Sequence, residues 1–348
     1  MGSGPIARWT AGAFVAVALV VAAAVLLGGR TPASHASPAA KPKTPSWKCP
    51  GTRTAVRGSG LKLPAYSATS PFNRAIPSDA VVADGSDASV QGLVSASGGG
   101  GFLVALQRWT VAVYYADSKT PKVKVPITAS WAQGLKSITG LIPVPSAAKP
   151  DPSTDGHMAV IDRAANCEYD FFNARYDESG KLVAGWENSI RLDGTGVFPR
   201  GLSARGSGFA LLGGLIFPAE LRSGEINHAL VFSYPDVKVG GPVRPATESD
   251  GQSTVATALP EGTLVRLDPS LDLSTLGLTP YERTIARALQ AYGMYLADHG
   301  GNSGITLYAV NPLSYRGKPY TGLLPDEVYV SLGHIPVDRF QVLLPLAP

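Results

Sequence analysis

Short apolar segments separated by Gly and Pro are the feature that most limits what this chain of 348 residues can fold into. The sequence contains 39 Gly and 29 Pro, and charged residues make up only 16% of it. Chain breakers at this density exclude a long helical bundle, and the low charge content excludes a charge-rich disordered chain. The remaining segments are short and rich in β-branched or aromatic residues, which is typical of strands in a mainly β protein.

Seven such segments are predicted to be strands because each is bounded by Gly, Pro or Asp. They are residues 111–115, 122–127, 157–162, 167–175, 226–233, 263–268 and 305–310. The third and fourth segments are joined by four residues and form a predicted hairpin. Two short helices are predicted as well, one that follows the cap at residues 84–87 and one over residues 218–223.

One long helix is predicted from Pro280 to about His299. Thr279 and Glu282 form a capping box, Pro280 takes the first helical position, and a pair of Gly residues follows the last turn. Apolar residues recur at helical spacing along this stretch, so one face packs on a sheet. We therefore expect a mainly β fold, a single β-sandwich or jelly-roll-like domain with one long flanking helix over about residues 280–299.

The N-terminal part of the chain carries an export signal. Residues 10–29 form an uninterrupted apolar run between basic residues, and Ser34-His35-Ala36 offers small residues at both recognition positions of a cleavage site. A retained membrane anchor is the alternative, because the length of the run is at the lower limit for a helix that spans a membrane. We predict a signal peptide or N-terminal anchor over residues 1–36, a basic Pro/Ala/Lys-rich linker over 37–69 and a β-rich globular domain over 70–348.

The basic residues are concentrated near the N-terminus. No acidic residue precedes Asp79, and the remainder of the chain is mildly acidic. Such a basic linker suits an anionic cell wall or surface, although a linker without a partner stays open. We expect a secreted or cell-surface protein whose partner is an extracellular polysaccharide or cell wall, with no nucleic acid. A membrane is expected only through the N-terminal segment if it is uncleaved.

The two cysteines, Cys49 and Cys167, both follow the export signal. An even number of cysteines in an oxidising compartment favours one disulfide bond between them. Two separate buried thiols are the alternative.

No strong catalytic motif occurs in the sequence, since HExxH, GxSxG, a Walker loop and CxxC are all missing. The candidates are instead polar residues in predicted strands: His157, His228 and Asp170. Buried polar groups must be paired, so these residues are predicted to form a cluster for proton transfer. The alternative is that each histidine binds a backbone carbonyl. No metal site and no cofactor are predicted.

Two further positions carry candidate residues. Asp298 falls at the C-terminal end of the predicted long helix, where a negative charge is unfavourable and needs a partner. Trp186 and Glu187 follow a Gly-rich turn, and an aromatic ring beside a carboxylate on a loop is common in sugar-binding clefts. A half-buried Trp with a solvated Glu is the alternative interpretation.

Several strings also resemble a known group of proteins. They include DGHMAVID at 155–162, GEINHAL at 224–230, RLDPS at 266–270, ALQAYG at 288–293 and DHGG at 298–301. The chain resembles a family of secreted bacterial and fungal proteins without an assigned activity. The resemblance implies one exported domain over about residues 70–345 and supplies no mechanism.

Together these features predict a secreted carbohydrate-active enzyme, a polysaccharide lyase or glycoside hydrolase. His157 and His228 would act as base and acid, with Asp170 or Asp298 orienting one imidazole. Trp186 and Glu187 would bind the substrate. The alternative is a non-catalytic module that binds glycan or cell wall.

Overall fold

Two β-sheets form the framework of the described part of the chain. The computed structural model describes residues 48–49, 63–98, 101–132, 140–301 and 304–346. The predicted N-terminal element at 1–36 and most of the predicted linker at 37–69 lie outside these residues. The mainly β class predicted from the sequence is confirmed.

The larger sheet has seven strands in the order β14-β1-β13-β10-β12-β11-β15. In chain order, these strands are β1 (Phe102–Ala105), β10 (Leu230–Tyr234), β11 (Leu264–Leu267), β12 (Met294–His299), β13 (Ile305–Tyr308), β14 (Tyr329–Ser331) and β15 (Phe340–Val342). The pairs β1–β13 and β10–β12 are parallel, and the other neighbours are antiparallel.

The smaller sheet has four strands in the order β2-β5-β6-β9. These are β2 (Ala112–Ala116), β5 (Met158–Asp162), β6 (Cys167–Phe172) and β9 (Trp186–Arg191). The predicted hairpin is confirmed, because β5 and β6 pair antiparallel along their length. Two further ribbons have two strands each: β3 (Lys122–Lys124) with β4 (Leu141–Pro143), and β7 (Arg175–Tyr176) with β8 (Leu182–Val183).

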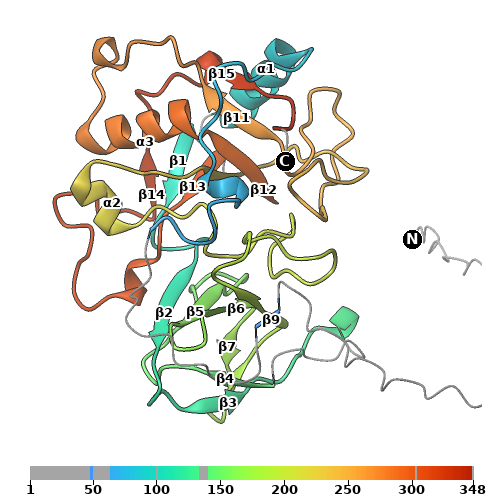
Figure 1. Cartoon of the computed structure of the whole chain (residues 1–348), viewed down its shortest axis with the longest axis vertical. Helices are drawn as coiled ribbons and strands as arrows, with labels where there is room; N and C mark the ends of the chain where they lie inside the picture. The colour runs from blue at the N-terminus through green and yellow to red at the C-terminus, as the bar shows by residue number, and fades with distance from the viewer. Residues whose placement is uncertain (1–47, 50–62, 99–100, 133–139, 302–303, 347–348) are drawn as a thin grey trace, which may run out of the picture. The chain divides into compact units, whose positions relative to one another are not determined.

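The three α-helices of the described chain are short: α1 (Ser86–Ser97), α2 (Pro218–Ser223) and α3 (Pro280–Ala291). The capping box of α3 is present as predicted. The predicted extension of this helix to His299 is wrong. Gly293 has φ +73°, which a right-handed helix does not allow, so the chain turns there and leaves the helix. A Cβ at Gly293 would also lie 2.7 Å from the carbonyl oxygen of Val265. The residues that follow form the interior strand β12 (Figure 1).

A single sandwich or jelly roll does not clearly describe these sheets, so that part of the fold prediction is corrected. Jelly rolls are built from antiparallel strands, whereas three strand pairs here are parallel: β1–β13, β10–β12 and β2–β5. Parallel neighbours need long crossover connections. Strand-forming residues look alike in both arrangements, so the sequence pattern alone did not reveal the crossovers.

The larger sheet has a buried apolar layer on each face, as β12 illustrates. Met294 and Leu296 belong to an apolar cluster with residues of α1 and α3. Tyr295 and Ala297 belong to a second cluster, which also includes Val113 of the smaller sheet. Neighbouring residues of a strand point to opposite faces, so β12 is buried on both sides. Figure 1 shows α1 and α3 beside the larger sheet and the smaller sheet below it.

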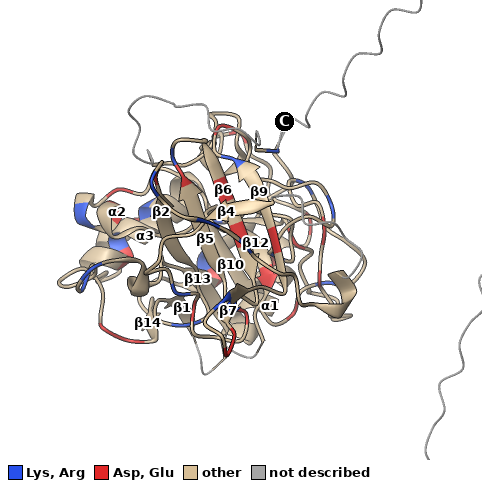
Figure 2. Cartoon of the chain, turned by 90° about the horizontal axis from the view of Figure 1, so that it is seen from below, with Lys and Arg blue, Asp and Glu red and all other residues tan. Residues whose placement is uncertain are grey.

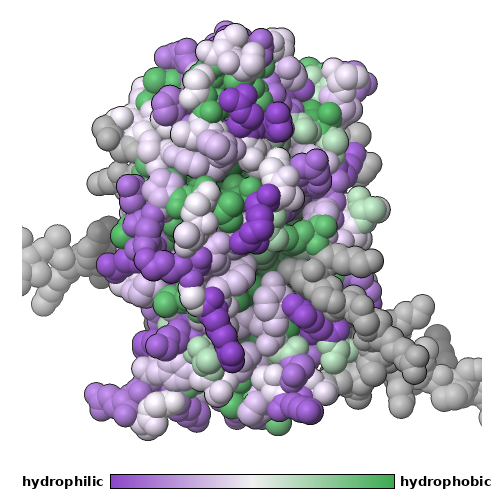
Figure 3. All heavy atoms as spheres, turned by 90° about the vertical axis from the view of Figure 1, so that its left-hand side faces the viewer, coloured by the Kyte–Doolittle hydropathy of each residue, from purple (hydrophilic) through white to green (hydrophobic). Residues whose placement is uncertain are grey.

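The predicted disulfide bond between Cys49 and Cys167 is confirmed, with the two Cα atoms 5.7 Å apart. It ties Cys49 to the first residue of β6 and indicates an oxidising compartment. In the part of the chain that the structure describes, no helix has the length and apolar character needed to cross a membrane. Figure 3 shows one face of the molecule, on which hydrophobic and hydrophilic residues are interspersed.

Candidate functional site

A buried arginine in the segment between β9 and α2 brings charged residues of both sheets together. The Arg205 side chain is 1% exposed, and its Nη1 donates to the carbonyl oxygen of Gly213 at 3.3 Å. Its guanidinium carbon lies 5.4 Å from the ring centroid of Tyr308 on β13. Its Nε lies 3.6 Å from Oδ2 of Asp298 on β12. Burying a charge without partners is costly, so the guanidinium depends on the Gly213 carbonyl, the Tyr308 ring and the Asp298 carboxyl group around it.

Asp298 lies near the end of β12, where its side chain is 18% exposed. Burial raises the pKa of Asp298 to about 8, and the attraction of Arg205 offsets only part of this effect. The negative charges of Asp250 and Asp155 raise the pKa further, while a hydrogen bond from the Gly206 N–H lowers it. Asp298 is therefore mostly protonated at neutral pH, and its carboxyl group is still within reach of solvent.

A second carboxyl group with a raised pKa lies beside Asp298. Glu261, in the turn before β11, is fully buried, and its Oε2 accepts a hydrogen bond from the backbone N–H of Asp250 at 3.2 Å. Burial raises the pKa of Glu261 to about 9, and the charges of Asp250 and Asp298 add to this effect. Asp250 itself is exposed to solvent and lies near His299.

The carboxyl groups of Asp250 and Asp298 both lie against the backbone of Gly206. The N–H of Gly206 donates to the Asp298 carboxyl group. A Cβ at Gly206 would lie 2.7 Å from the Asp250 Cγ, so a side chain there would push the Asp250 carboxyl group away. Gly206 thus has a carboxyl group on each side: that of Asp298 is mostly buried, and that of Asp250 is exposed. Figure 2 shows acidic residues in red on β12 and on β6.

A separate pair of carboxyl groups holds the segment that carries Arg205. Glu168 and Asp170 lie two residues apart on β6, on the same face of the strand, and both are fully buried. Oε1 of Glu168 accepts from the Leu212 N–H at 2.8 Å, and Oδ2 of Asp170 accepts from the Leu211 N–H at 2.9 Å.

The same pair of carboxyl groups also receives a hydrogen bond from a side chain. The Tyr66 hydroxyl donates to Oε2 of Glu168 at 2.6 Å. Burial raises the pKa of Asp170 well above its usual range, and the negative charge of Glu168 adds to the shift. The predicted catalytic residue Asp170 thus lies deep in the protein, where it fixes backbone.

His157 lies next to the Arg205 segment, at the start of β5. Its Nε2 is 3.2 Å from the carbonyl oxygen of Ala204, and its ring centroid is 5.8 Å from that of Phe172. Burial lowers the pKa of His157 to about 3, and the positive charge of Arg205 contributes to this shift. A neutral imidazole at this distance donates to the carbonyl oxygen, so His157 holds the segment beside the arginine.

His228 lies at a different place, against α2. Its Nε2 is 2.9 Å from Oε1 of Glu220, and its Nδ1 is 2.9 Å from the carbonyl oxygen of Ala229. Burial lowers the pKa of His228, but the hydrogen bond and charge of Glu220 outweigh it, so the net shift is upward. The described contacts include none that joins His228 to His157. The structure therefore does not bring the two predicted catalytic histidines together.

Trp186 and Glu187 are not on a loop, so that part of the prediction is wrong. Both belong to β9 and both are buried, at 2% and 1% exposure. The Trp186 Nε1 donates to the carbonyl oxygen of Leu202 at 3.1 Å, and its ring lies 5.9 Å from that of Trp131. Trp131 is 61% exposed and presents the free aromatic surface of this pair. The predicted binding role of Trp186 and Glu187 stays a prediction.

The structure brings three of the four predicted catalytic residues to the surroundings of Arg205, namely His157, Asp170 and Asp298. Sequence reasoning missed Arg205, Asp250 and Glu261. Each of the three lies in a segment rich in Gly, Ser and Pro, where no periodicity marks a buried position. A single arginine among small residues, between apolar segments, is the signal from which Arg205 could have been found.

No match to this chain was found in comparisons with protein-family models, with curated proteins and with solved structures. The resemblance to a secreted family therefore stays a prediction. Within the described ranges, no group of three or more His, Cys, Asp or Glu residues is arranged to hold a metal ion.

Proposed function

We propose that this protein is a secreted enzyme that cleaves an extracellular polysaccharide by acid–base catalysis, with Asp298 as the proton donor. One observation carries the proposal: Asp298 has a pKa of about 8 and is mostly buried, yet 18% of its side chain is exposed. Cleavage of a glycosidic bond requires protonation of the leaving oxygen. A carboxyl group that is still protonated at neutral pH is suited to that step.

The neighbouring carboxyl group favours hydrolysis over elimination. Glycoside hydrolases pair a protonated carboxyl group with an ionised one, and the two differ because their environments differ. Asp250 is the more exposed of the two and lies beside Asp298 at the backbone of Gly206. Partial burial raises the pKa of Asp250, and the positive charge of nearby His299 offsets part of this effect and favours the ionised form. In this proposal Asp250 is the carboxylate that activates water or attacks the sugar.

The residues on the buried side of this pair hold it in place and do not transfer protons themselves. Arg205 fixes the Asp298 carboxyl group from the buried side, and His157 holds the segment of Arg205 through the carbonyl of Ala204. Arg205 stays charged at neutral pH. His157, with a pKa of about 3, is neutral there, so it is a very weak base and carries no extra proton that it could donate as an acid. The proton transfers are therefore assigned to the carboxyl groups rather than to the predicted histidines.

The test is a panel of polysaccharides read for new reducing ends and for unsaturated products that absorb in the ultraviolet. Asp298→Asn should lower turnover by about 10²- to 10⁴-fold, which is what general acid catalysis typically supplies. Asp326→Asn is the matched control because Asp326 is exposed and makes surface contacts, an ion pair with Lys318 and a hydrogen bond from Gln107. This control should keep the wild-type rate.

The pH profile gives a second readout. Asp298 must be protonated to donate, so turnover should fall as the pH rises through about 8, where this carboxyl group ionises. Gly206→Ala should lower turnover without unfolding the protein, since the added methyl group displaces the flexible Asp250 carboxyl group rather than backbone.

Two results would overturn the proposal. One is wild-type turnover by Asp298→Asn on a polysaccharide that the protein cleaves. The other is binding of polysaccharides without any product, which would favour the non-catalytic module. Unsaturated products that accompany the new reducing ends would replace hydrolysis by a lyase reaction.

A further inference from the structure

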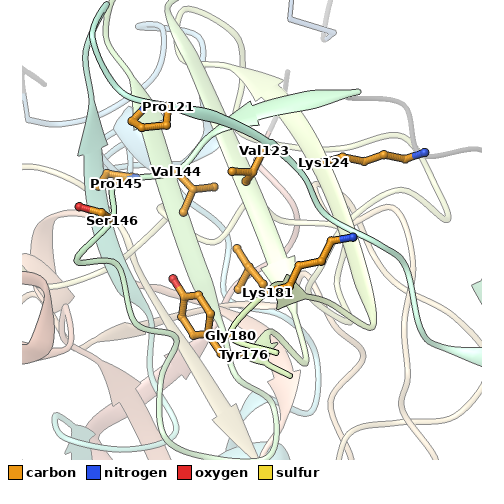
Figure 4. Close-up of a pocket in the computed structure, with 10 residues that line it drawn as sticks. Pro121, Val123, Lys124, Val144, Pro145, Ser146, Tyr176, Gly180 and Lys181 are labelled. Atoms are coloured by element: carbon orange, nitrogen blue, oxygen red, sulfur yellow. The ribbon is translucent and has the colours of Figure 1, made fainter. Parts of the chain in front are cut away.

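A groove of about 550 Å³ lies between the β3–β4 ribbon and the β7–β8 ribbon, and the carboxyl groups around Asp298 do not line it. Its volume is within the range of about 300–1,000 Å³ that is typical of ligand sites. Val123, Val144 and Leu182 supply apolar surface, and Pro121 and Pro145 supply rigid rings. Figure 4 shows Pro121, Val123, Val144 and Pro145 around the groove.

Tyr176 supplies an aromatic ring whose position is fixed. Its hydroxyl donates to the carbonyl oxygen of Ala148 at 2.8 Å, while 42% of the residue remains exposed. A ring held by its own hydrogen bond loses little conformational entropy when a ligand packs on it. Flat apolar and aromatic walls of this kind suit the C–H face of a sugar ring.

Two lysines add positive charge on one side of the groove. Figure 4 shows the amino groups of Lys124 and Lys181 extending in the same direction. Both side chains are exposed, and neither forms an ion pair with an acidic residue in the described chain. Asp177, four residues before Lys181, accepts hydrogen bonds from Ser179 and from the backbone N–H of Lys181, and its charge also interacts with that of Lys181. Since neither amino group is held in an ion pair, both can bind an anionic ligand.

We propose that this groove binds an anionic polysaccharide, with a uronate ring packed on Tyr176 and its carboxylate bound by Lys124 and Lys181. Charge complementarity selects the anion, and the rigid rings of Tyr176, Pro121 and Pro145 select a sugar over a flexible acyl chain. The inference does not depend on the proposed hydrolysis, because a binding groove on these ribbons holds its ligand whether or not Asp298 transfers a proton.

The experiment is isothermal titration calorimetry of the full secreted protein with a hexamer of galacturonate. A neutral glucan hexamer and vesicles containing anionic phospholipid are the comparison ligands. Lys124→Gln/Lys181→Gln should weaken binding of the uronate hexamer by about tenfold or more, since it removes two charge-assisted contacts. Lys238→Gln/Lys318→Gln is the matched control, because it removes two exposed lysines outside the groove and should bind like wild type.

Two substitutions of Tyr176 distinguish the contribution of its ring to ligand binding from that of its hydroxyl group. Tyr176→Phe keeps the ring and should bind within a few-fold of wild type, whereas Tyr176→Ala should bind about tenfold more weakly. The proposal is overturned if the neutral glucan binds as well as the uronate, if only the vesicles bind, or if removal of the groove lysines leaves binding unchanged. Asp298→Asn should bind the hexamer like wild type, so failure of the hydrolysis proposal and failure of this one give different results.

Discussion

Replacing His228 with Ala tests whether this histidine is structural, and the structure sets the size of the effect. The His228 Nε2 lies 2.9 Å from Glu220 Oε1, and the two side chains are 5% and 8% exposed. Removing the imidazole leaves the Glu220 carboxylate buried without its cation. Breaking a buried ion pair in this way costs about 3–5 kcal/mol. We therefore expect the free energy of unfolding to fall by that amount.

The chain offers a matched control in His334. Its Nδ1 lies 2.9 Å from Oε2 of Glu282, but the His334 side chain is 58% exposed. Glu282 also keeps its hydrogen bonds from Thr279 when the imidazole is removed. Glu282 is itself 1% exposed, but it also accepts from the His334 backbone N–H, so it stays hydrogen-bonded when the exposed imidazole is removed. His334→Ala should therefore cost clearly less than His228→Ala. The two variants delete the same contact at the same distance and differ in the burial of the imidazole.

Urea and thermal unfolding at pH 6, followed by tryptophan fluorescence, measure both effects. Each kcal/mol shifts Tm by about 2–4 °C in a domain of this size, so His228→Ala should melt at least about 6 °C below wild type. Burial lowers the pKa of His228, yet Glu220 raises it more, so the net shift is upward. The stabilisation is then complete below the unfolded pKa of about 6.5 and is lost as the pH rises through the higher folded value.

The difference in unfolding free energy between wild type and His228→Ala should therefore shrink toward alkaline pH. The reasoning is refuted if His228→Ala is no less stable than His334→Ala at pH 6. It is also refuted if His228→Ala keeps wild-type stability and abolishes turnover, because His228 would then be a catalytic residue.

Two further predictions concern stability. Replacing Cys49 and Cys167 together with Ser should lower the free energy of unfolding by up to about 5 kcal/mol, since the bond joins residues 118 positions apart in sequence. Equal urea midpoints with and without the bond would contradict this. Thr279→Ala should cost about 1 kcal/mol by removing the cap of α3, whereas the exposed Thr321→Ala should not; thermal unfolding compares the two.

Local signals in the sequence predicted local structure well. The helix over Pro218–Ser223 and the capping box at Thr279 and Glu282 were predicted from residue types and spacing alone, and both are present. The cysteine pair was predicted from its number and compartment. Each of these signals depends on a few neighbouring residues or on a count, so tertiary contacts did not need to be known.

The end of α3 could not be predicted in the same way. Met294, Tyr295, Leu296 and Ala297 are all buried because β12 is covered on both faces. A strand buried on both faces lacks the alternation that marks a strand, and its apolar residues also fit a helical stripe. The sequence could therefore not distinguish a longer helix from a turn and a strand.

The surroundings of Arg205 were only partly predictable for a different reason. Asp298 was selected because it needed a partner, but the helix end that motivated the choice is a strand end. Arg205, Asp250 and Asp298 are separated by tens of residues and come together only through the tertiary fold, from the β9–α2 segment, the β10–β11 segment and β12. Nothing in the local sequence of any one of them indicates the other two.

The strand order of the two sheets also determines when each can be completed as the chain is synthesised. The smaller sheet lies entirely within residues 112–191, so a chain that emerges from its N-terminus can complete this sheet early. Strand β1 emerges before it, yet both partners of β1 arrive much later, at residues 305–308 and 329–331. Until then β1 is an unpaired apolar edge, the kind of segment on which partly folded chains aggregate. The emerging chain thus has a long interval in which a chaperone would have to cover residues 102–105.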